Sequence, residues 1–217
     1  MKNRIIYLCL LCSLVIAVCY LCGCSDEETI DREEELPAAE FYMPDIKLEA
    51  AIREELGKLP RELLTIADME QLVDLIADNK GIMDIRGLEY AVNLVDLRLC
   101  NNQIADLEPL GNLTAIYRLH LSNNLITDIT PLSSLSYLED LKLDGNRIAD
   151  ISPLNNNKSL RWVDLINNEI EDISAFEISG LPLLGYVNLS GNKLDPDHKK
   201  TKAKIDELAE SIPDLRY

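Results

Sequence analysis

One pattern of apolar and polar positions, L-x-x-L-x-L-x-x-N-x-I-x-x-I/L, is repeated five times between Leu94 and Leu194. The copies begin at Leu94, Ile116, Leu138, Leu160 and Leu184, so the successive spacings are 22, 22, 22 and 24 residues. A fixed period of this length is typical of a solenoid, in which each repeat buries its apolar face against its neighbours. The pattern therefore predicts a stack of repeats that presents one extended surface.

Within each repeat, the spacing of the apolar residues predicts a short strand followed by a turn. Leu97 and Leu99 are two residues apart, so their side chains point to the same face of a strand. The Asn that follows, Asn102 in the first copy, has donor and acceptor groups that can satisfy backbone groups where the strand turns away. We therefore expect a buried Asn ladder, formed by Asn102, Asn124, Asn146, Asn168 and Asn192.

The second half of each repeat predicts a tight segment on the opposite side of the solenoid. The pattern D-[IL]-x-P-L occurs at Asp106–Leu110, Asp128–Leu132 and Asp150–Leu154. In the fourth copy Ala175 replaces the proline and two extra residues follow, so we expect a bulge or a longer helical turn around Phe176–Pro182.

These repeats resemble the 22-residue class of bacterial leucine-rich repeats, the internalin-like type. A degenerate copy in the same phase begins at Leu72, with Ala77 at a leucine position and Lys80 at the Asn position. The resemblance implies an α/β solenoid with a curved parallel β-sheet on the concave side and 3-10 or irregular segments on the convex side. One degenerate and five regular repeats would span residues 72–195.

Both ends of such a solenoid require caps, because an open end would expose the core and a strand edge. For the N-terminal cap, residues 43–71, the segment Pro44–Leu59 has apolar residues at helical spacing, with Asp45 as the candidate N-cap and with Gly57 and Pro60 ending the helix. A second short helix should begin at Thr65, with Asp68 completing a partial capping box. This preface resembles the N-terminal cap of internalin-like proteins. We interpret both caps as lids rather than as partner-binding helices.

The C-terminal cap, residues 196–217, has apolar residues at helical spacing between Ile205 and Ile212. Asp197 is the candidate N-cap, and Pro213 should end the helix. We expect Leu215 and Tyr217 to pack back on the last repeat.

The N-terminus predicts export and a membrane tether. Residues 1–23 have the form of a signal peptide, with basic residues before the apolar run Ile5–Leu21. The motif Leu21-Cys22-Gly23-Cys24 resembles a bacterial lipobox, which implies that Cys24 is lipidated. The alternative is an uncleaved membrane anchor. After processing, Cys100 would be the only unmodified cysteine, so no disulfide is expected.

Residues 24–42 are acidic and should form a disordered tether. The segment is either a solvated spacer or, by resemblance, the surface-export tag of Bacteroidota lipoproteins. Removal of residues 1–23 would leave 19 basic and 38 acidic side chains, a net charge of −19. Nucleic acid and anionic lipid headgroups are poor partners for such a surface. We therefore expect membrane contact only through the N-terminal lipid. Acidity is also an ordinary route to solubility.

Outward positions of the concave sheet lie between the core leucines and hold the candidate partner-binding residues. An apolar cluster and a basic strip follow from this phase: Trp162, Tyr186 and Ile166, and Arg98, Arg118, His120 and Lys142. Exposed aromatic and arginine residues are typical interface anchors. In the alternative interpretation, Trp162 packs sideways on Tyr186 and the charges pair across strands.

The expected ligand is a protein or a glycan, and the predicted face is small. A stable partner must therefore also use the flanks or the caps; otherwise the ligand is small, or its binding is weak and multivalent. Six strands about 4.8 Å apart and about 11 Å long give a face on the order of 260 Å². A standard protein interface needs about 800 Å² on each side. A structural spacer without a dedicated ligand is the alternative function.

The sequence contains little that indicates enzymatic activity. There are two histidines, His120 and His198, and no metalloprotease motif or glycine-rich phosphate loop. His120 could lie near Asp140, and a Cys100–His120 nucleophilic pair is the remote enzymatic alternative. The recurring acidic residues could suggest a calcium ladder, but local turn hydrogen bonds are the favoured explanation for Asp106, Asp128, Asp150 and Asp172. We therefore predict a binding protein without enzymatic activity, cofactor or metal.

Overall fold

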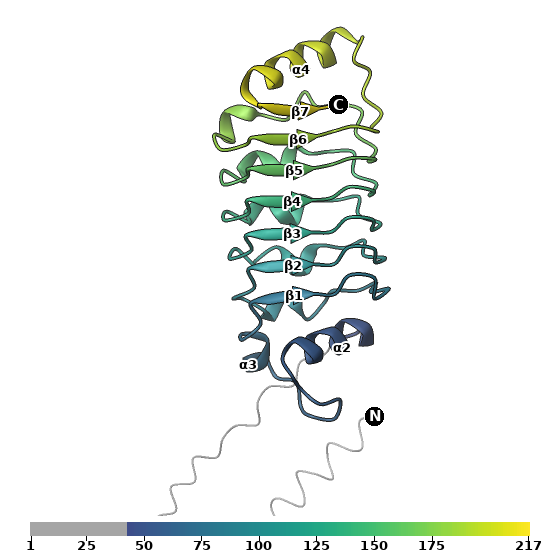
Figure 1. Cartoon of the computed structure of the whole chain (residues 1–217), viewed down its shortest axis with the longest axis vertical. Coiled ribbons are helices and arrows are strands. Elements are labelled where there is room, and N and C mark those ends of the chain that lie inside the picture. The colour runs from purple at the N-terminus through teal and green to yellow at the C-terminus, as the bar shows by residue number, and fades with distance from the viewer. Residues whose placement is uncertain (1–42) are drawn as a thin grey trace, which may run out of the picture. The chain divides into compact units, whose positions relative to one another are not determined.

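The computed structural model describes residues 43–217. The expected signal peptide (1–23), the lipidation site Cys24 and the acidic tether (24–42) lie outside the described residues. The described part forms the predicted repeat solenoid, with a parallel sheet on one side and 3-10 turns on the other. Its strands form one sheet in chain order with every neighbouring pair parallel (Figure 1). They are β1 (Asp74–Ile76), β2 (Asp96–Arg98), β3 (Arg118–His120), β4 (Asp140–Lys142), β5 (Trp162–Asp164), β6 (Tyr186–Asn188) and β7 (Asp214–Arg216).

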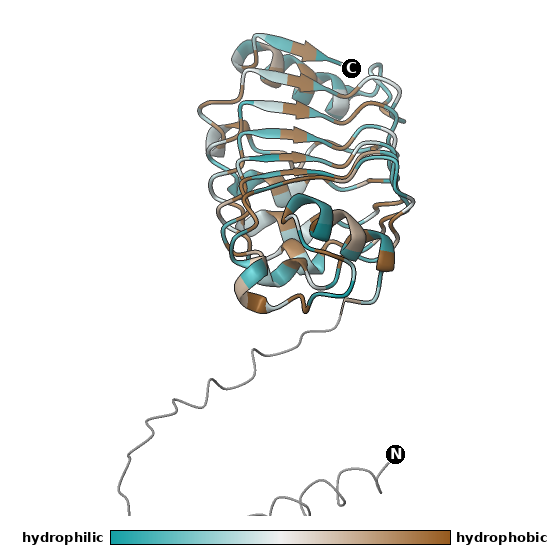
Figure 2. Cartoon of the chain, turned by 60° about the horizontal axis from the view of Figure 1, so that its bottom comes forward, coloured by the Kyte–Doolittle hydropathy of each residue, from teal (hydrophilic) through white to brown (hydrophobic). Residues whose placement is uncertain are grey.

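The central residue of each strand faces the core and the two flanking residues face outward. Leu97, Leu119 and Leu141 are in register and fully buried. Figure 2 shows hydrophobic and hydrophilic positions alternating along the strands. Truncation of one such core leucine to alanine removes about 2–5 kcal/mol of stability.

Short 3-10 turns form the convex side: η1 (Leu88–Tyr90), η2 (Glu108–Leu110), η3 (Thr130–Ser134), η4 (Ser152–Asn156) and η5 (Ile178–Gly180). Proline occupies the first turn of η2, η3 and η4, where its missing N–H would have no helical acceptor. Each recurring Asp accepts a hydrogen bond from the backbone N–H two residues later, as in Asp106 Oδ1 with Glu108 N at 2.9 Å. These turn bonds account for the acidic residues without a metal ion.

The Asn side chains at the end of each strand connect successive repeats. Asn124 Nδ2 donates to Leu99 O at 2.9 Å and to Leu121 O at 3.0 Å, and Asn124 Oδ1 accepts from Ile104 N at 3.0 Å. The same three bonds recur at the other positions, with Asn102, Asn124, Asn146 and Asn168 buried. The ladder therefore satisfies backbone groups that the turns leave open inside the core.

Two helices cap the N-terminal end. Helix α2 (Ile46–Glu55) begins with the side chain of Asp45 accepting hydrogen bonds from its first turn, as predicted. It ends just before Gly57, which has a φ of 66° as expected of a terminating glycine, whereas Leu59 is 65% exposed rather than buried. Helix α3 (Ile66–Met69) has both hydrogen bonds of the capping box between Thr65 and Asp68, which confirms that prediction.

The C-terminal cap corrects two predictions. Helix α4 (Lys199–Ser211) begins after His198, so Asp197 is not its N-cap. After Pro213 the chain forms β7, in which Leu215 pairs with Val187 of β6. The expectation of six strands is therefore wrong by one, because the tail extends the sheet. No helix among residues 43–217 has the length and apolar character needed to cross a bilayer.

Candidate ligand-binding site on the concave sheet

The parallel register aligns the outward side chains into two columns across the sheet. The first column contains Asp74, Asp96, Arg118, Asp140, Trp162, Tyr186 and Asp214. The second column contains Ile76, Arg98, His120, Lys142, Asp164, Asn188 and Arg216. Six of the seven predicted binding residues lie in these columns, and half-buried Ile166 follows β5.

Charges in the N-terminal part of the face are paired with one another, and we call this part the paired region: Asp78, Asp96, Arg98, Arg118, His120 and Asp140. Arg118 Nη1 donates to Asp96 Oδ2, and Arg118 Nε lies 3.4 Å from Asp140 Oδ2. Hydrogen bonding to the Asp96 carboxylate raises the pKa of Arg118. Arg98 Nη2 lies 3.2 Å from Asp78 Oδ2. The expected basic strip is therefore largely neutralised within the face.

His120 and Cys100 form no activated nucleophile in the paired region. His120 Nε2 lies 3.2 Å from Asp140 Oδ2, and burial lowers the pKa of the imidazole although Asp140 acts to raise it. Burial raises the pKa of the Cys100 thiol, and the nearby Asp78 adds to this effect. A thiol held protonated is a poor nucleophile, so the geometry offers no support for a Cys100–His120 pair.

The C-terminal part of the face is built around a stack of rings, and we call it the aromatic region: Lys142, Trp162, Asp164, Tyr186 and Asn188. The Trp162 and Tyr186 rings are stacked with centroids 3.6 Å apart and planes 10° apart. Asn188 Nδ2 donates to Tyr186 Oη at 3.0 Å, and the Arg216 guanidinium lies 5.4 Å from the Tyr186 ring centroid. The stack is therefore held by its neighbours rather than free to rotate.

Exposure separates the two aromatic residues. Trp162 is 42% exposed, whereas Tyr186 is 6% exposed. The expectation that both rings offer surface to a partner is therefore corrected: Trp162 presents the surface, and Tyr186, from the neighbouring strand β6, stacks on one face of its ring. Trp162 therefore packs on Tyr186, as in the alternative interpretation, and it also presents an exposed aromatic surface.

Two opposite charges beside Trp162 have no ion-pair partner. Among residues 43–217, Lys142 Nζ makes no hydrogen bond or ion pair. Asp164 Oδ1 accepts from Ile166 N at 3.2 Å, and burial raises the pKa of this carboxyl, with a smaller contribution from Asp144. Lys142 and Asp164 are paired in the strand register but form no ion pair. Their polar groups are therefore available to a ligand.

Sequence reasoning missed two contributions to this surface. Arg216, which lies against Tyr186, was missed because β7 is not part of a repeat. A flank ridge formed by Val73, Val95 and Tyr117 was also missed. Backbone hydrogen bonds align these three residues directly before the strands, and they are 46%, 36% and 41% exposed. Their sequence signal is an apolar residue immediately before the first column.

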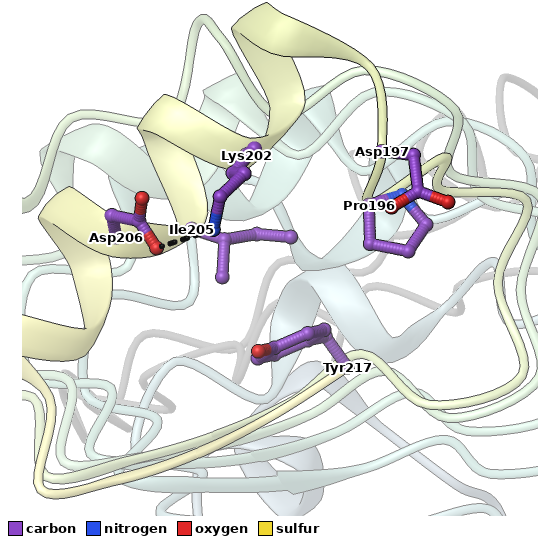
Figure 3. Close-up of a pocket in the computed structure, with 6 residues that line it drawn as sticks. All are labelled: Pro196, Asp197, Lys202, Ile205, Asp206 and Tyr217. Carbon is purple, nitrogen blue, oxygen red and sulfur yellow. Dashed lines mark hydrogen bonds and ion pairs between the residues drawn. The ribbon is translucent and has the colours of Figure 1, made fainter.

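A pocket at the C-terminal cap lies apart from the predicted site residues. Figure 3 shows its lining, which comes from the segment before α4, from α4 itself and from the last residue: Pro196, Asp197, Lys202, Ile205, Asp206 and Tyr217. Lys202 Nζ and Asp206 Oδ1 are paired at 3.5 Å across the helix surface. No residue of the aromatic region lines this pocket.

Comparison with known proteins agrees with this architecture. The family models described as "Leucine Rich repeats (2 copies)" and "Leucine rich repeat" match residues 92–134 and 136–194. A structure of internalin F from Listeria monocytogenes is 28% identical, with 73% of this chain and 53% of that chain covered and a TM-score of 0.60. Internalin C2 from the same organism is 31% identical, with 72% and 88% covered and a TM-score of 0.52.

A leucine-rich-repeat protein of Leptospira interrogans shares the fold at 23% identity and a TM-score of 0.50, with 63% of this chain and 40% of that chain covered. No curated protein matches the sequence. The repeats define the chain as a leucine-rich-repeat protein. Within that class, it belongs to the internalin-like family. It spans about half the length of the internalin F chain, 53%. Proteins of this type bind protein partners and are generally not enzymes.

Proposed function

We propose that this protein is a non-enzymatic binding protein of the cell envelope that holds a partner on its concave sheet, with Trp162 as the anchor. The observation that carries the proposal is the exposed Trp162 ring fixed on a buried Tyr186. Aromatic anchors of this kind dominate the energy of many interfaces. Because the ring is already held in place, less side-chain entropy is lost when a partner binds.

The size of the face determines how a protein partner would sit. Seven strands about 4.8 Å apart and about 11 Å long give a face on the order of 320 Å². This area is less than half of the roughly 800 Å² that a standard interface buries on each side. The exposed Val73, Val95 and Tyr117 are continuous with the first column, so a partner that also covers this flank ridge gains apolar contact area.

The acidic character of the chain narrows the partners further. The full sequence has a net charge of −17, which favours neutral or basic partners over nucleic acid. We propose that the only membrane contact is a lipid on Cys24, with the repeats outside the cytoplasm and exposed at the outer-membrane surface. Homologues of the internalin type are surface or secreted proteins, which supports an extracytoplasmic site.

A pull-down followed by substitution tests the proposed binding. The immobilised protein should capture a partner from envelope or host extracts, and a Trp162→Ala, Tyr186→Ala double variant should bind that partner about tenfold or more weakly. Tyr137→Ala is the matched control, because Tyr137 is 67% exposed but lies outside both columns. Unchanged affinity of the double variant would contradict the concave site. Absence of any captured partner would favour the structural spacer.

Labelling and proteolysis test the proposed location. Growth with a labelled fatty acid should label the protein, and Cys24→Ser should abolish the label. Protease treatment of intact cells should remove the repeats if they are on the outer surface. Retention of the label in Cys24→Ser would contradict lipidation at this residue.

A further inference from the structure

Four residues of β4 and β5 form a small square next to the ring stack: Asp140, Lys142, Trp162 and Asp164. Asp140 and Trp162 are neighbours in the first column, and Lys142 and Asp164 are neighbours in the second column. Neighbouring strands are about 4.8 Å apart and alternate residues about 6.6 Å apart, so the square measures about 5 by 7 Å. This area accommodates one six-membered ring rather than an extended segment.

Trp162 is 42% exposed, and Tyr186 is the one ring stacked on it among residues 43–217. Tyr186, from β6, covers one face of the ring at a centroid distance of 3.6 Å. Because the strand order is β4-β5-β6, the uncovered face is turned toward β4, where Lys142 and Asp140 lie. The site therefore combines the flat apolar surface of the Trp162 ring with a polar floor, by which we mean the side chains of Lys142 and Asp164.

The polar groups of the floor require both hydrogen-bond directions from one ligand. The Lys142 ammonium only donates, whereas the Asp164 carboxylate only accepts when it is ionised. These two groups form no bond with each other in the described structure. A ligand that satisfies both must accept from Lys142 and donate to Asp164.

Charge balance disfavours a charged ligand at this square. A cation stacked on Trp162 would lie beside the Lys142 ammonium, which has no ion-pair partner, and of the two nearby carboxylates Asp140 is already paired with Arg118 and His120. An anion would face the carboxylates of Asp140 and Asp164, with Asp144 close enough to affect Asp164. A neutral ligand with several hydroxyl groups avoids both repulsions.

We infer that this square of Asp140, Lys142, Trp162 and Asp164 binds a neutral pyranose residue of a glycan. The apolar C–H face of the sugar stacks on the indole, one sugar hydroxyl accepts from Lys142, and another donates to Asp164. This inference rests on the proposed function, because it names the ligand class of the same face. The paired region offers no second such site, since its arginines are already bonded to Asp78, Asp96 and Asp140. A single sugar subsite gives weak binding that repeated ligand units strengthen.

Tryptophan fluorescence of the full-length protein tests the inference directly, because the chain contains one tryptophan. The probes are neutral hexasaccharides of glucose, mannose and N-acetylglucosamine, titrated separately. At least one should produce a saturable fluorescence change. By calorimetry, Trp162→Ala should weaken binding about tenfold or more, and Trp162→Phe should retain most of it. Lys142→Met and Asp164→Asn should each weaken binding about three- to tenfold.

Matched controls separate recognition from loss of structure. Tyr137→Ala and Lys158→Gln, an exposed position after η4, should bind the sugar like the parent protein, and all variants should retain the far-ultraviolet circular dichroism of the parent. Absence of a saturable response to all three sugars would overturn the inference. Tighter binding of a basic or acidic peptide than of any sugar would also overturn it. If the sugars fail while the Trp162, Tyr186 double variant still loses its captured partner, the glycan inference falls and the proposed concave binding site stands.

Discussion

The paired region and the aromatic region occupy the same sheet with the same backbone register, but they differ in how their polar groups are satisfied. In the paired region, Arg118 lies between two carboxylates, Asp96 and Asp140, and bonds to both. In the aromatic region, Lys142 and Asp164 are neighbours without a bond, beside a half-exposed indole. A uniform scaffold thus supports one part whose charges are internally balanced and another part whose groups remain open.

The difference indicates a division of roles along the face. A guanidinium that already has two carboxylate partners gains little from a ligand, because ligand bonds must replace existing ones. Groups without partners lose only water when a ligand arrives. We therefore expect substitutions in the paired region to change stability and substitutions in the aromatic region to change binding.

The largest expected effect tests whether the two regions have equivalent scaffolds. Asn124→Ala, beside the paired region, and Asn168→Ala, beside the aromatic region, each remove three hydrogen bonds to buried backbone groups. Each should lower the free energy of unfolding by about 3 kcal/mol in urea titrations. Gln103→Ala, at an exposed position, should change it by less than about 0.5 kcal/mol. A difference of more than about 1 kcal/mol between the two Asn variants would show that the scaffold is not uniform.

An intermediate effect should distinguish the paired cation from the unpaired one. Arg118→Ala should lower the free energy of unfolding by about 1 kcal/mol, a modest loss because the side chain is 40% exposed. Lys142→Ala should change it by less than about 0.5 kcal/mol, since no partner is lost. Chemical denaturation of both variants measures the difference. Equal losses of unfolding free energy in the two variants would contradict the proposed difference between the paired region and the aromatic region.

The smallest effect is the pH dependence contributed by His120 in the paired region. Burial lowers the pKa of this imidazole below the ordinary 6.5, while Asp140 raises it and Lys142 and Arg98 oppose its protonation. Between the lowered folded-state value and 6.5, the unfolded chain binds more protons, so stability should fall as the pH decreases through this range. His120→Gln should reduce that fall in denaturation experiments at about pH 7.5 and about pH 5. A variant with the same pH dependence as the parent would refute this contribution.

The repeat phase was sufficient to predict the buried leucines and the outward columns, because each depends only on a period of two or of 22 residues. The bonds among outward side chains were not predictable in this way. Lys142 and Asp164 are adjacent residues of opposite charge, but they form no ion pair in the described structure. Whether such a pair forms depends on the side-chain conformations, which the repeat phase does not specify. The burial of Tyr186 likewise depends on Trp162 and Arg216, which come from two other strands.

The ends of the solenoid were predicted less well because they lack the repetition that gives the interior its signal. The segment Asp214–Arg216 contains a single strand-core leucine, so its residue pattern did not predict a seventh strand. Helix α2 was placed correctly at its Asp45 cap, where a specific side chain accepts backbone hydrogen bonds. Its end was also placed correctly at Gly57, whereas Leu59 was wrongly expected to pack, because it continues the apolar spacing beyond the last helical turn.

The Asn ladder has a consequence for how such a protein can change its length. Asn146 bonds back to Leu121 O and Ile126 N, which are 25 and 20 residues earlier, and Asn168 repeats the same offsets to Leu143 O and Ile148 N. The junctions between repeats spaced by 22 residues are therefore interchangeable, whereas the junction at Asn192 differs because its offsets are 27 and 22 residues. Deletion or duplication of one 22-residue unit leaves each remaining Asn with equivalent partners. Deletion or duplication of a repeat thus removes or adds one strand of the concave face. Side chains from strands that were apart then become neighbours, and the fold is unchanged.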